Sequence, residues 1–311
     1  MSAVTKGARR VLNALRQVGP REVVPQRRET PEPVNEPTTG DTVALLEEAG
    51  ERIRLDVLRQ LDQSRAYQPF VGEASVEHLP IIMCLWDRRE RFEEILRMVD
   101  GVDAPRPLRL ILWNDNEADS TYYRERLEAF TPEGAIASIE FHSSSKNIRG
   151  IARFLAVVDL DQQGYRGPIV TLDDDQIVQP DFVTRLLQGY EPQTVSGYWA
   201  WSSRLDDYGA RRQPPVGEIA NYVGTGGAIF DSQIVRDRTY FTSIPRNGVL
   251  IEDVWMTRWA QSRGWRTFRA DINVHMVEDG RNQFSALIPI KMKFWLELQE
   301  RFPVEASEFQ G

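Results

Sequence analysis

The sequence predicts an α/β protein with a mostly parallel central sheet, flanking helices and an additional helix before the sheet. From residue 79 onward, apolar runs of strand length alternate with amphipathic helical patterns, which is typical of a parallel sheet covered by helices. The chain has 311 residues, of which 41% are hydrophobic, so it can bury a large core.

The first 28 residues are strongly basic, with seven Lys or Arg against one acid, so this segment carries about +6 and the remainder about −14. Within it, ARRVLNALRQV could form a short amphipathic helix that touches an anionic membrane surface, and a disordered tail is the alternative. Residues 29–40, ETPEPVNEPTTG, are typical of an extended linker. We expect residues 1–40 to form this tail and linker, 41–67 a helix and 68–311 the main domain.

The pattern over residues 41–67 predicts a helix that begins at Asp41 or Thr42. Apolar side chains recur there at steps of three and four and form one stripe: Leu46, Ala49, Ile53, Val57 and Leu61. The stripe should pack on the main domain or on a second copy of the chain, which would make a homodimer.

The main domain is predicted from alternating patterns in chain order. Strands are expected at 79–86, 108–113, 137–142 and 167–175, and helices at 88–100, 121–130, 146–163, 180–190 and 252–265. A last amphipathic helix is expected at 291–302, packed on the core, on a partner or at a membrane surface.

Polar side chains gather where three of these strands end. They are Asp87 and Arg88, Asn114 and Asp115, and the run Asp173, Asp174 and Asp175. Ligands of parallel sheets bind beyond the carboxyl ends of the strands, so a shared site is predicted there.

Bulk properties exclude several classes of function. The net charge of −8 and the pI of about 5.2 do not favour nucleic-acid binding. The single cysteine, Cys84, lies in the apolar run IIMCLW, where a buried structural thiol in a reducing compartment is expected. No apolar run approaches 18 residues. We expect a cytoplasmic protein that contacts at most the inner face of a membrane.

The run VTLDDDQIVQPDF raises the question of what offsets the repulsion of three adjacent carboxylates. In an extended strand Asp173 and Asp175 point to one side and Asp174 to the other, which makes a D-x-D pair suited to Mg²⁺ or Mn²⁺. A helix cap followed by a solvated turn is the alternative.

Six segments in this order resemble a family 2 glycosyltransferase of the GT-A fold. They are PIIMCLWDR, LILWNDNEAD, KNIRGIARFLAV, VTLDDDQIVQPDF, YVGTGGAIFD and IEDVWMTRWAQSRGW, and they lie within residues 79–276. Two departures concern the donor nucleotide: Gln176 stands where the family often has an aspartate, and NDN where it often has DDG.

The resemblance implies a nucleotide-sugar donor, with a UDP-sugar favoured, and a Mn²⁺ or Mg²⁺ ion. Asp115 would contact the base, Asp173 the ribose or the hydrated cation, and Asp175 the cation itself. The remaining residues implied to lie at the nucleotide are Leu85, Asp87, Arg88, Lys146, Asn147, Arg153 and Asp174.

The resemblance also implies the catalytic and acceptor groups. Asp253, or else Glu252, would take the proton from the acceptor hydroxyl. The glycine-rich segment with Gly226 and Gly227 would shape the acceptor pocket. From the residues themselves, Trp201 is a candidate for stacking on a sugar. The resemblance also makes His275 a candidate third metal ligand, because many enzymes of the GT-A fold supply a histidine late in the chain. A structural role for His275 is the alternative.

The expected function is therefore metal-dependent transfer of a sugar to a hydroxyl acceptor, with inversion, in polysaccharide or glycolipid assembly. A sugar nucleotidyltransferase of similar fold is one alternative, although no glycine follows the first strand as that class would require. A non-catalytic carbohydrate-binding protein is the other.

Overall fold

The computed structural model describes residues 39–277, 281 and 287–303, and it confirms the predicted α/β class with a mostly parallel central sheet. The basic segment and nearly all of the linker predicted for residues 1–40 lie outside the described residues. The membrane contact predicted for that segment therefore stays a prediction.

In the described part of the chain, eight strands form one sheet in the order β1-β4-β3-β2-β5-β11-β7-β12. Strands β4, β3, β2 and β5 run parallel, as do β7 and β12, whereas β1 and β11 are antiparallel to their neighbours. The bounds are β1 (Gln68–Val71), β2 (Leu79–Leu85), β3 (Leu108–Asn114), β4 (Ile136–Ser143), β5 (Pro168–Asp173), β7 (Thr194–Gly197), β11 (Ala228–Asp231) and β12 (Arg266–Arg269).

Shorter strands stand beside the central sheet at the end where the site lies. Strands β8 (Ala200–Arg204), β9 (Asp207–Arg212) and β10 (Tyr222–Val223) form a small antiparallel sheet. Strand β6 (Gln176–Val178) pairs with β13 (Val274–Met276).

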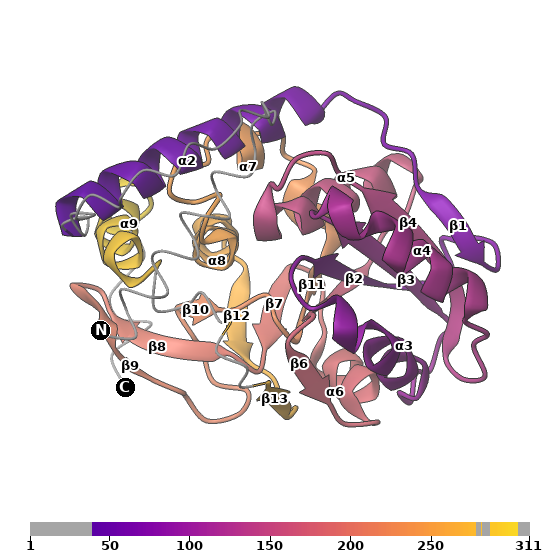
Figure 1. Ribbon diagram of the computed structural model, residues 1–311. Coiled ribbons are helices and arrows are strands. Elements are labelled where there is room, and N and C mark those ends of the chain that lie inside the picture. Colours follow the sequence, from indigo (N-terminus) through magenta and orange to yellow (C-terminus); the bar gives the residue numbers. More distant parts are fainter. Residues whose placement is uncertain (1–38, 278–280, 282–286, 304–311) are drawn as a thin grey trace, which may run out of the picture.

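Helices cover both faces of the central sheet (Figure 1). Their bounds are α2 (Thr39–Gln60), α3 (Phe92–Asp100), α4 (Ser120–Ala129), α5 (Ala152–Gln162), α6 (Phe182–Gly189), α7 (Thr239–Thr242), α8 (Glu252–Ser262) and α9 (Ile288–Arg301). One buried cluster joins the sheet to α3, α4 and α6, and another joins its opposite face to α2, α5, α8 and α9.

The alternation of strand β2 explains how one apolar run serves both clusters. Ile81, Met83 and Leu85 belong to the cluster with α3 and α6, whereas Ile82 belongs to the cluster with α5. Adjacent side chains of a strand point to opposite faces, and both faces are covered here, so a continuous apolar run is required.

The predicted stripe on the first helix is buried within the same chain. Leu46, Ala49, Ile53 and Val57 of α2 are each at most 4% exposed. Helix α2 contacts α5, α7 and α9, and it crosses the top of the molecule in Figure 1. The stripe therefore packs on the main domain, and the homodimer stays a prediction.

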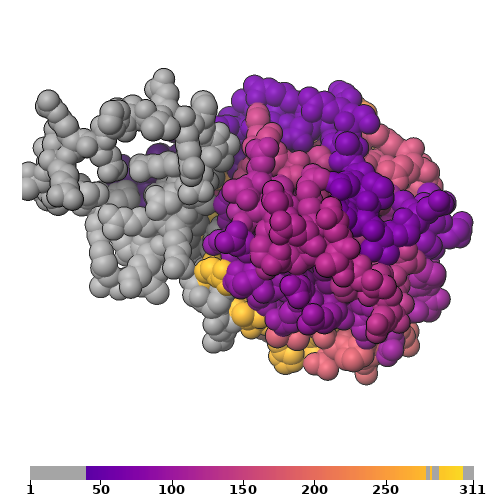
Figure 2. All heavy atoms as spheres, turned by 45° about the vertical axis from the view of Figure 1, so that its right-hand side comes forward, coloured from indigo at the N-terminus to yellow at the C-terminus, as the bar shows by residue number. Residues whose placement is uncertain are grey.

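From the side of β1 and α4, the surface is formed mainly by the first half of the chain, coloured indigo to magenta (Figure 2). Among the described residues, no helix combines the length and the apolar character needed to cross a membrane.

Candidate active site

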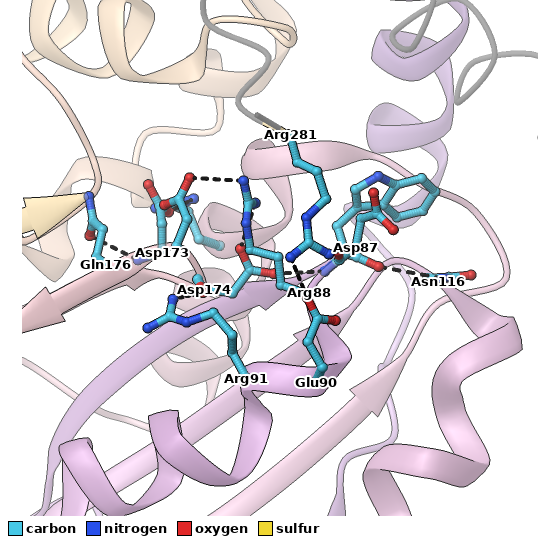
Figure 3. A network of polar contacts seen from close by, with 12 residues as sticks. Asp87, Arg88, Glu90, Arg91, Asn116, Asp173, Asp174, Gln176 and Arg281 are labelled. Atoms are coloured by element: carbon cyan, nitrogen blue, oxygen red, sulfur yellow. Dashed lines mark hydrogen bonds and ion pairs between the residues drawn. The ribbon is translucent and has the colours of Figure 1, made fainter. Parts of the chain in front are cut away.

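The three aspartates stand where β5 ends and the chain turns into β6. Asp173 is the last residue of β5, and Asp174 and Asp175 form the turn. Strand alternation therefore does not extend through the run. The turn is held by Arg91, whose Nη1 donates to the carbonyl oxygen of Asp174 at 2.6 Å (Figure 3).

Asp174 is a buried carboxylate within the site, although the strand pattern pointed it away. Its oxygens accept from the backbone N–H of Trp86 and from Nη1 of Arg88, each at 3.3 Å. Burial raises the pKa of Asp174 to about 6, while Arg88 opposes that rise. Asp174 therefore anchors the loop after β2 to the loop after β5.

Asp175 faces the same guanidinium. Its Oδ2 lies 3.5 Å from Nη2 of Arg88. Burial, followed by the nearby charge of Asp173, raises the pKa of Asp175 to about 7. The cost of gathering the carboxylates is thus partly offset by arginine.

Asp173 belongs to a second network with Arg153 of α5. Nη2 of Arg153 lies 2.8 Å from Oδ1 of Asp173 and 3.8 Å from Oε1 of Glu252. Its other nitrogens donate to the carbonyl oxygens of Gly150 and Thr225. Arg153 is 4% exposed and so holds the strand end and the start of α8 together.

A cavity of about 280 Å³ opens beyond the carboxyl ends of β2, β3 and β5, and we call it the donor cavity after the role predicted for its residues. The structure brings most of the predicted nucleotide and metal residues to its wall: Leu85, Asp87, Arg88, Asp115, Asn147, Arg153, Asp173, Asp174 and Asp175. Lys146 is not among its lining residues, because its Nζ pairs with Asp56 of α2 at 2.5 Å.

Asp115 is the deepest acid of the donor cavity. Its Oδ1 accepts from Nε1 of Trp113 at 3.1 Å and from the backbone N–H of Ile148 at 3.4 Å. Burial raises the pKa of Asp115 to about 8, against the effect of these hydrogen bonds. At neutral pH this group is mostly a neutral acid that can both donate and accept a hydrogen bond.

A second cavity, of about 580 Å³, adjoins the first, and we call it the acceptor cavity after the role predicted for Trp201 and Gly226, which line it. Both cavities are lined by Asp173, Leu250 and Glu252. Trp201 and Gly226 also line the acceptor cavity. A Cβ on Gly226 would meet the ends of the Gln176 and Asp173 side chains, so a larger residue there would require both side chains to shift.

Gly227 is not among the residues that line either cavity. Its φ of +68° lies in the left-handed region, and a Cβ there would lie 2.7 Å from Cγ2 of Val274. Gly227 shapes the loop rather than the cavity wall.

The two acids at the start of α8 differ in their surroundings. Asp253 lines only the acceptor cavity, and its Oδ2 accepts from the hydroxyl of Tyr222 at 2.5 Å. Glu252 lies at the junction, where it accepts from Oγ1 of Thr225 at 3.4 Å. Burial raises the pKa of Glu252 to about 7, and Arg153 opposes this rise.

His275 is not brought to the aspartates. It lies on β13 opposite Ile177 and lines neither cavity, whereas its neighbour Met276 lines the acceptor cavity. Because adjacent strand residues point to opposite sides, the His275 side chain lies on the face away from that cavity. The side chain of His275 is exposed, and both the ligand role and the structural role stay predictions.

The carboxylate oxygens in the cavity suit a hard cation that is bound together with a substrate. Among the described residues, no group of three or more His, Cys, Asp or Glu is arranged to hold a metal ion. Asp173 and Asp175 nevertheless bring carboxylate oxygens to one cavity. Mg²⁺ and Mn²⁺ need only one or two protein carboxylates where phosphates and water supply the other ligands.

Among the residues of the acceptor cavity that the sequence analysis did not predict, four have aromatic or basic side chains: Trp199, Arg211, Tyr222 and Lys291. Tyr222 stands two residues before Gly224, where the glycine-rich segment begins, which is a weak signal. Lys291 carries a stronger one, since it occupies a position of the apolar stripe of α9, three residues before Phe294 and seven before Leu298.

Glu252 makes a testable contribution to stability. Its pKa in the folded chain, about 7, lies above its ordinary value of 4.5, so the ionised form is disfavoured by folding. Protonated Glu252 therefore contributes stability that is fully present below pH 4.5, and this contribution is lost as the pH rises through 7. Between pH 5 and 8, the free energy of unfolding of Glu252→Gln should rise relative to wild type by about 2 kcal/mol.

Urea unfolding at pH 5, 6, 7 and 8 measures this difference. Glu128→Gln, at an exposed position, is the control. The free energies of unfolding of this variant and of wild type should follow parallel curves when plotted against pH. Parallel curves for Glu252→Gln would show that burial does not perturb this acid.

The sequence matches no family model and no curated protein. Among solved structures, the chain is similar to the mannosyltransferase PcManGT from Pyrobaculum calidifontis in complex with GDP-Man and Mn²⁺, with 16% identity and a TM-score of 0.45. It is also similar to the apo structure of the bifunctional glycosyltransferase WbbM, with 12% identity and a TM-score of 0.40. The matches cover 73% and 71% of this chain but only 66% and 46% of those chains. Both TM-scores are below 0.5, so the roles below are argued from the geometry of this chain.

Proposed function

We propose that the chain is a metal-dependent glycosyltransferase that moves a sugar from a nucleoside-diphosphate sugar to a hydroxyl acceptor. The observation that carries the proposal is the meeting of two cavities at Asp173 and Glu252. The donor cavity gathers acids and arginines at the ends of parallel strands, and the acceptor cavity has an aromatic wall and an acid. A donor and an acceptor bound there would meet at the junction.

The donor cavity has groups for each part of a nucleotide. The neutral acid of Asp115 can pair with the edge of a base, and Asn147 lines the wall nearby. Arg88 supplies a guanidinium, which suits a diphosphate. Leu85 and Asp87 complete the wall. UDP-sugars are the first donors to test, because the resemblance favours them.

Asp173 and Asp175 would hold the Mn²⁺ or Mg²⁺ ion. When bound, the ion would neutralise charge on the leaving diphosphate. Arg153 positions Asp173 through the 2.8 Å ion pair, and Arg88 lies beside Asp175. These arginines keep the carboxylates apart and oriented before any ligand arrives.

Asp253 is the proposed base. Its carboxylate faces the acceptor cavity, and the hydroxyl of Tyr222 fixes its orientation. It can accept the proton of an acceptor hydroxyl as that oxygen attacks the anomeric carbon from the side opposite the diphosphate. Direct attack of this kind inverts the configuration. Trp201 would stack on the acceptor. The charge of Glu252 would contribute to the electrostatic potential where the two cavities meet.

The class of acceptor and the location of the chain are also part of the proposal. We expect the acceptor to belong to a polysaccharide or glycolipid in assembly, and we expect a cytoplasmic location.

A panel of nucleotide sugars, tested by thermal shift with and without Mn²⁺, examines the donor cavity. At a concentration of 100 times Kd, a bound donor should stabilise the fold by about 2.7 kcal/mol, which raises the melting temperature of a domain of this size by about 4–5 °C. Asp175→Ala should lose the part of this shift that depends on Mn²⁺, because it removes a carboxylate that would hold the ion.

The exposed Asp206 offers a matched control, and Asp206→Ala should keep the full shift. If no nucleotide sugar shifts the melting temperature, or if Asp175→Ala keeps the shift that depends on Mn²⁺, the assignment fails.

A further inference from the structure

Two basic side chains line the acceptor cavity beside the acids. Arg211 lies on β9 and Lys291 on α9, so they come from segments 80 positions apart in the chain. Neither lines the donor cavity. They therefore have no contact with the cavity in which a diphosphate is expected.

A chain of contacts links the two cations to Asp253 within the acceptor cavity. From Asp253 the hydroxyl of Tyr222 leads to Tyr208, since the two tyrosine rings are 5.8 Å apart. Nη1 of Arg211 donates to the hydroxyl of Tyr208 at 3.0 Å, and Nζ of Lys291 lies 6.0 Å from the Tyr208 ring. Arg211 and Lys291 thus meet at Tyr208, which packs against the tyrosine that donates to Asp253.

Burial of the Lys291 side chain costs free energy, because it removes a charge from water. Lys291 is 5% exposed and stands in the apolar stripe of α9, where an uncharged side chain would be expected. Burial lowers the pKa of Lys291; the charge of Asp253 opposes this effect, the charge of Arg211 adds to it, and the charge of Glu252 opposes it to a smaller degree. Two cations that repel each other in a cavity are stabilised when an anion lies near both.

The rest of the wall suits a sugar. Trp199 and Trp201 line the cavity, and the guanidinium of Arg211 lies over the Trp201 ring at 4.6 Å. The indole Nε1 of Trp199 is buried and has no hydrogen-bond partner among the described residues. It is a donor that a ligand oxygen could satisfy.

From this arrangement we infer that the ligand of the acceptor cavity is an anionic sugar whose carboxylate or phosphate pairs with Lys291 and Arg211. Its ring would lie against Trp199 and Trp201, with a hydroxyl toward Asp253. This inference deepens the proposed function and rests on it for the ligand's role as the acceptor. Binding of the anionic sugar itself does not require a nucleotide-sugar donor.

The test is a ligand-detected NMR titration of the full chain without nucleotide, with three probes. Glucose is neutral, glucuronate adds a carboxylate, and glucose 6-phosphate adds a phosphate. At least one anionic probe should bind about tenfold more tightly than glucose, because a hydrogen-bonded charge pair contributes about that factor. The arm with the tighter binding identifies the anion.

Lys291→Met and Arg211→Met should each remove most of this preference and keep the affinity for glucose, since the aromatic wall remains. Lys293→Met is the matched control on the same helix, because Lys293 is exposed and pairs with Glu47. Equal affinities for the three probes, no binding of any of them, or a preference that survives Lys291→Met would overturn the inference.

The two proposals fail in different ways. A chain that prefers glucuronate but binds no nucleotide sugar would refute the glycosyltransferase and leave the anionic ligand in place. A chain that binds a nucleotide sugar but shows no preference among the three probes would refute the anionic ligand alone.

Discussion

Replacing Asp253 with asparagine is expected to lower the rate of sugar transfer by about 10²- to 10⁴-fold while donor affinity stays close to that of wild type. An amide cannot take the proton that the acceptor hydroxyl must lose. Asp253 does not line the donor cavity, so donor binding should not depend on it. Transfer rates and donor Kd values, measured for the donor that the thermal-shift panel selects, test both parts.

Two further variants separate the base from its neighbours. Tyr222→Phe removes the hydroxyl that donates to Asp253 and should lower the rate less than Asp253→Asn does. Asp206→Asn, at an exposed site, should not change it. If Asp253→Asn transfers at the wild-type rate and Glu252→Gln is inactive, the base is Glu252.

Replacing Arg153 with methionine should lower the free energy of unfolding by about 3–5 kcal/mol. The change would leave Asp173 and Glu252 without the cation that they share. It would also remove the donors to the carbonyl oxygens of Gly150 and Thr225. Urea unfolding at pH 8, where Glu252 is ionised, gives the largest difference.

Adding Glu252→Gln to this variant should restore about 1 kcal/mol or more, because one buried charge no longer needs a counter-ion. Arg185→Met is the control, since Arg185 forms its ion pairs at the surface. If Arg153→Met is no less stable than Arg185→Met, the network at the junction does not hold the fold together.

The parallel strands β2, β3, β4 and β5 were predicted because both faces of this part of the sheet are buried, whereas β1, β7, β11 and β12 were not predicted. Continuous apolar runs such as LPIIMCLW need cover on both sides, and the helices between them supply it. The antiparallel edge strand β1 (Gln68–Val71) was not predicted, since its four residues are half exposed and carry no apolar alternation. Tertiary pairing with β4 makes it a strand.

The donor cavity was predictable from topology. Parallel strands end at one edge, so Asp87, Asp115 and Asp173 had to lie near one another. Asn114, placed with them by the same argument, instead bonds to Ser120 and to the carbonyl oxygen of Asn116. A one-residue step along the strand end decides which side chain faces the cavity.

The acceptor cavity was harder to predict because its wall comes from separate elements. Lys291 on the C-terminal helix and Arg211 on a small sheet meet only through the tertiary fold. The orientation of Asp174 depends on where β5 ends, since β5 ends at Asp173, two residues before the end of the predicted strand 167–175. Loop geometry of this kind leaves little trace in local patterns of hydrophobicity.

Release of the nucleoside diphosphate from the donor that the panel selects is the most direct measurement of the central claim. In the presence of Mn²⁺, the wild-type chain should release it, and Asp175→Ala should release it at least tenfold more slowly at a donor concentration below Kd. Equal rates for wild type and Asp175→Ala, or no release from any donor that binds, would contradict the assignment of these two cavities to sugar transfer.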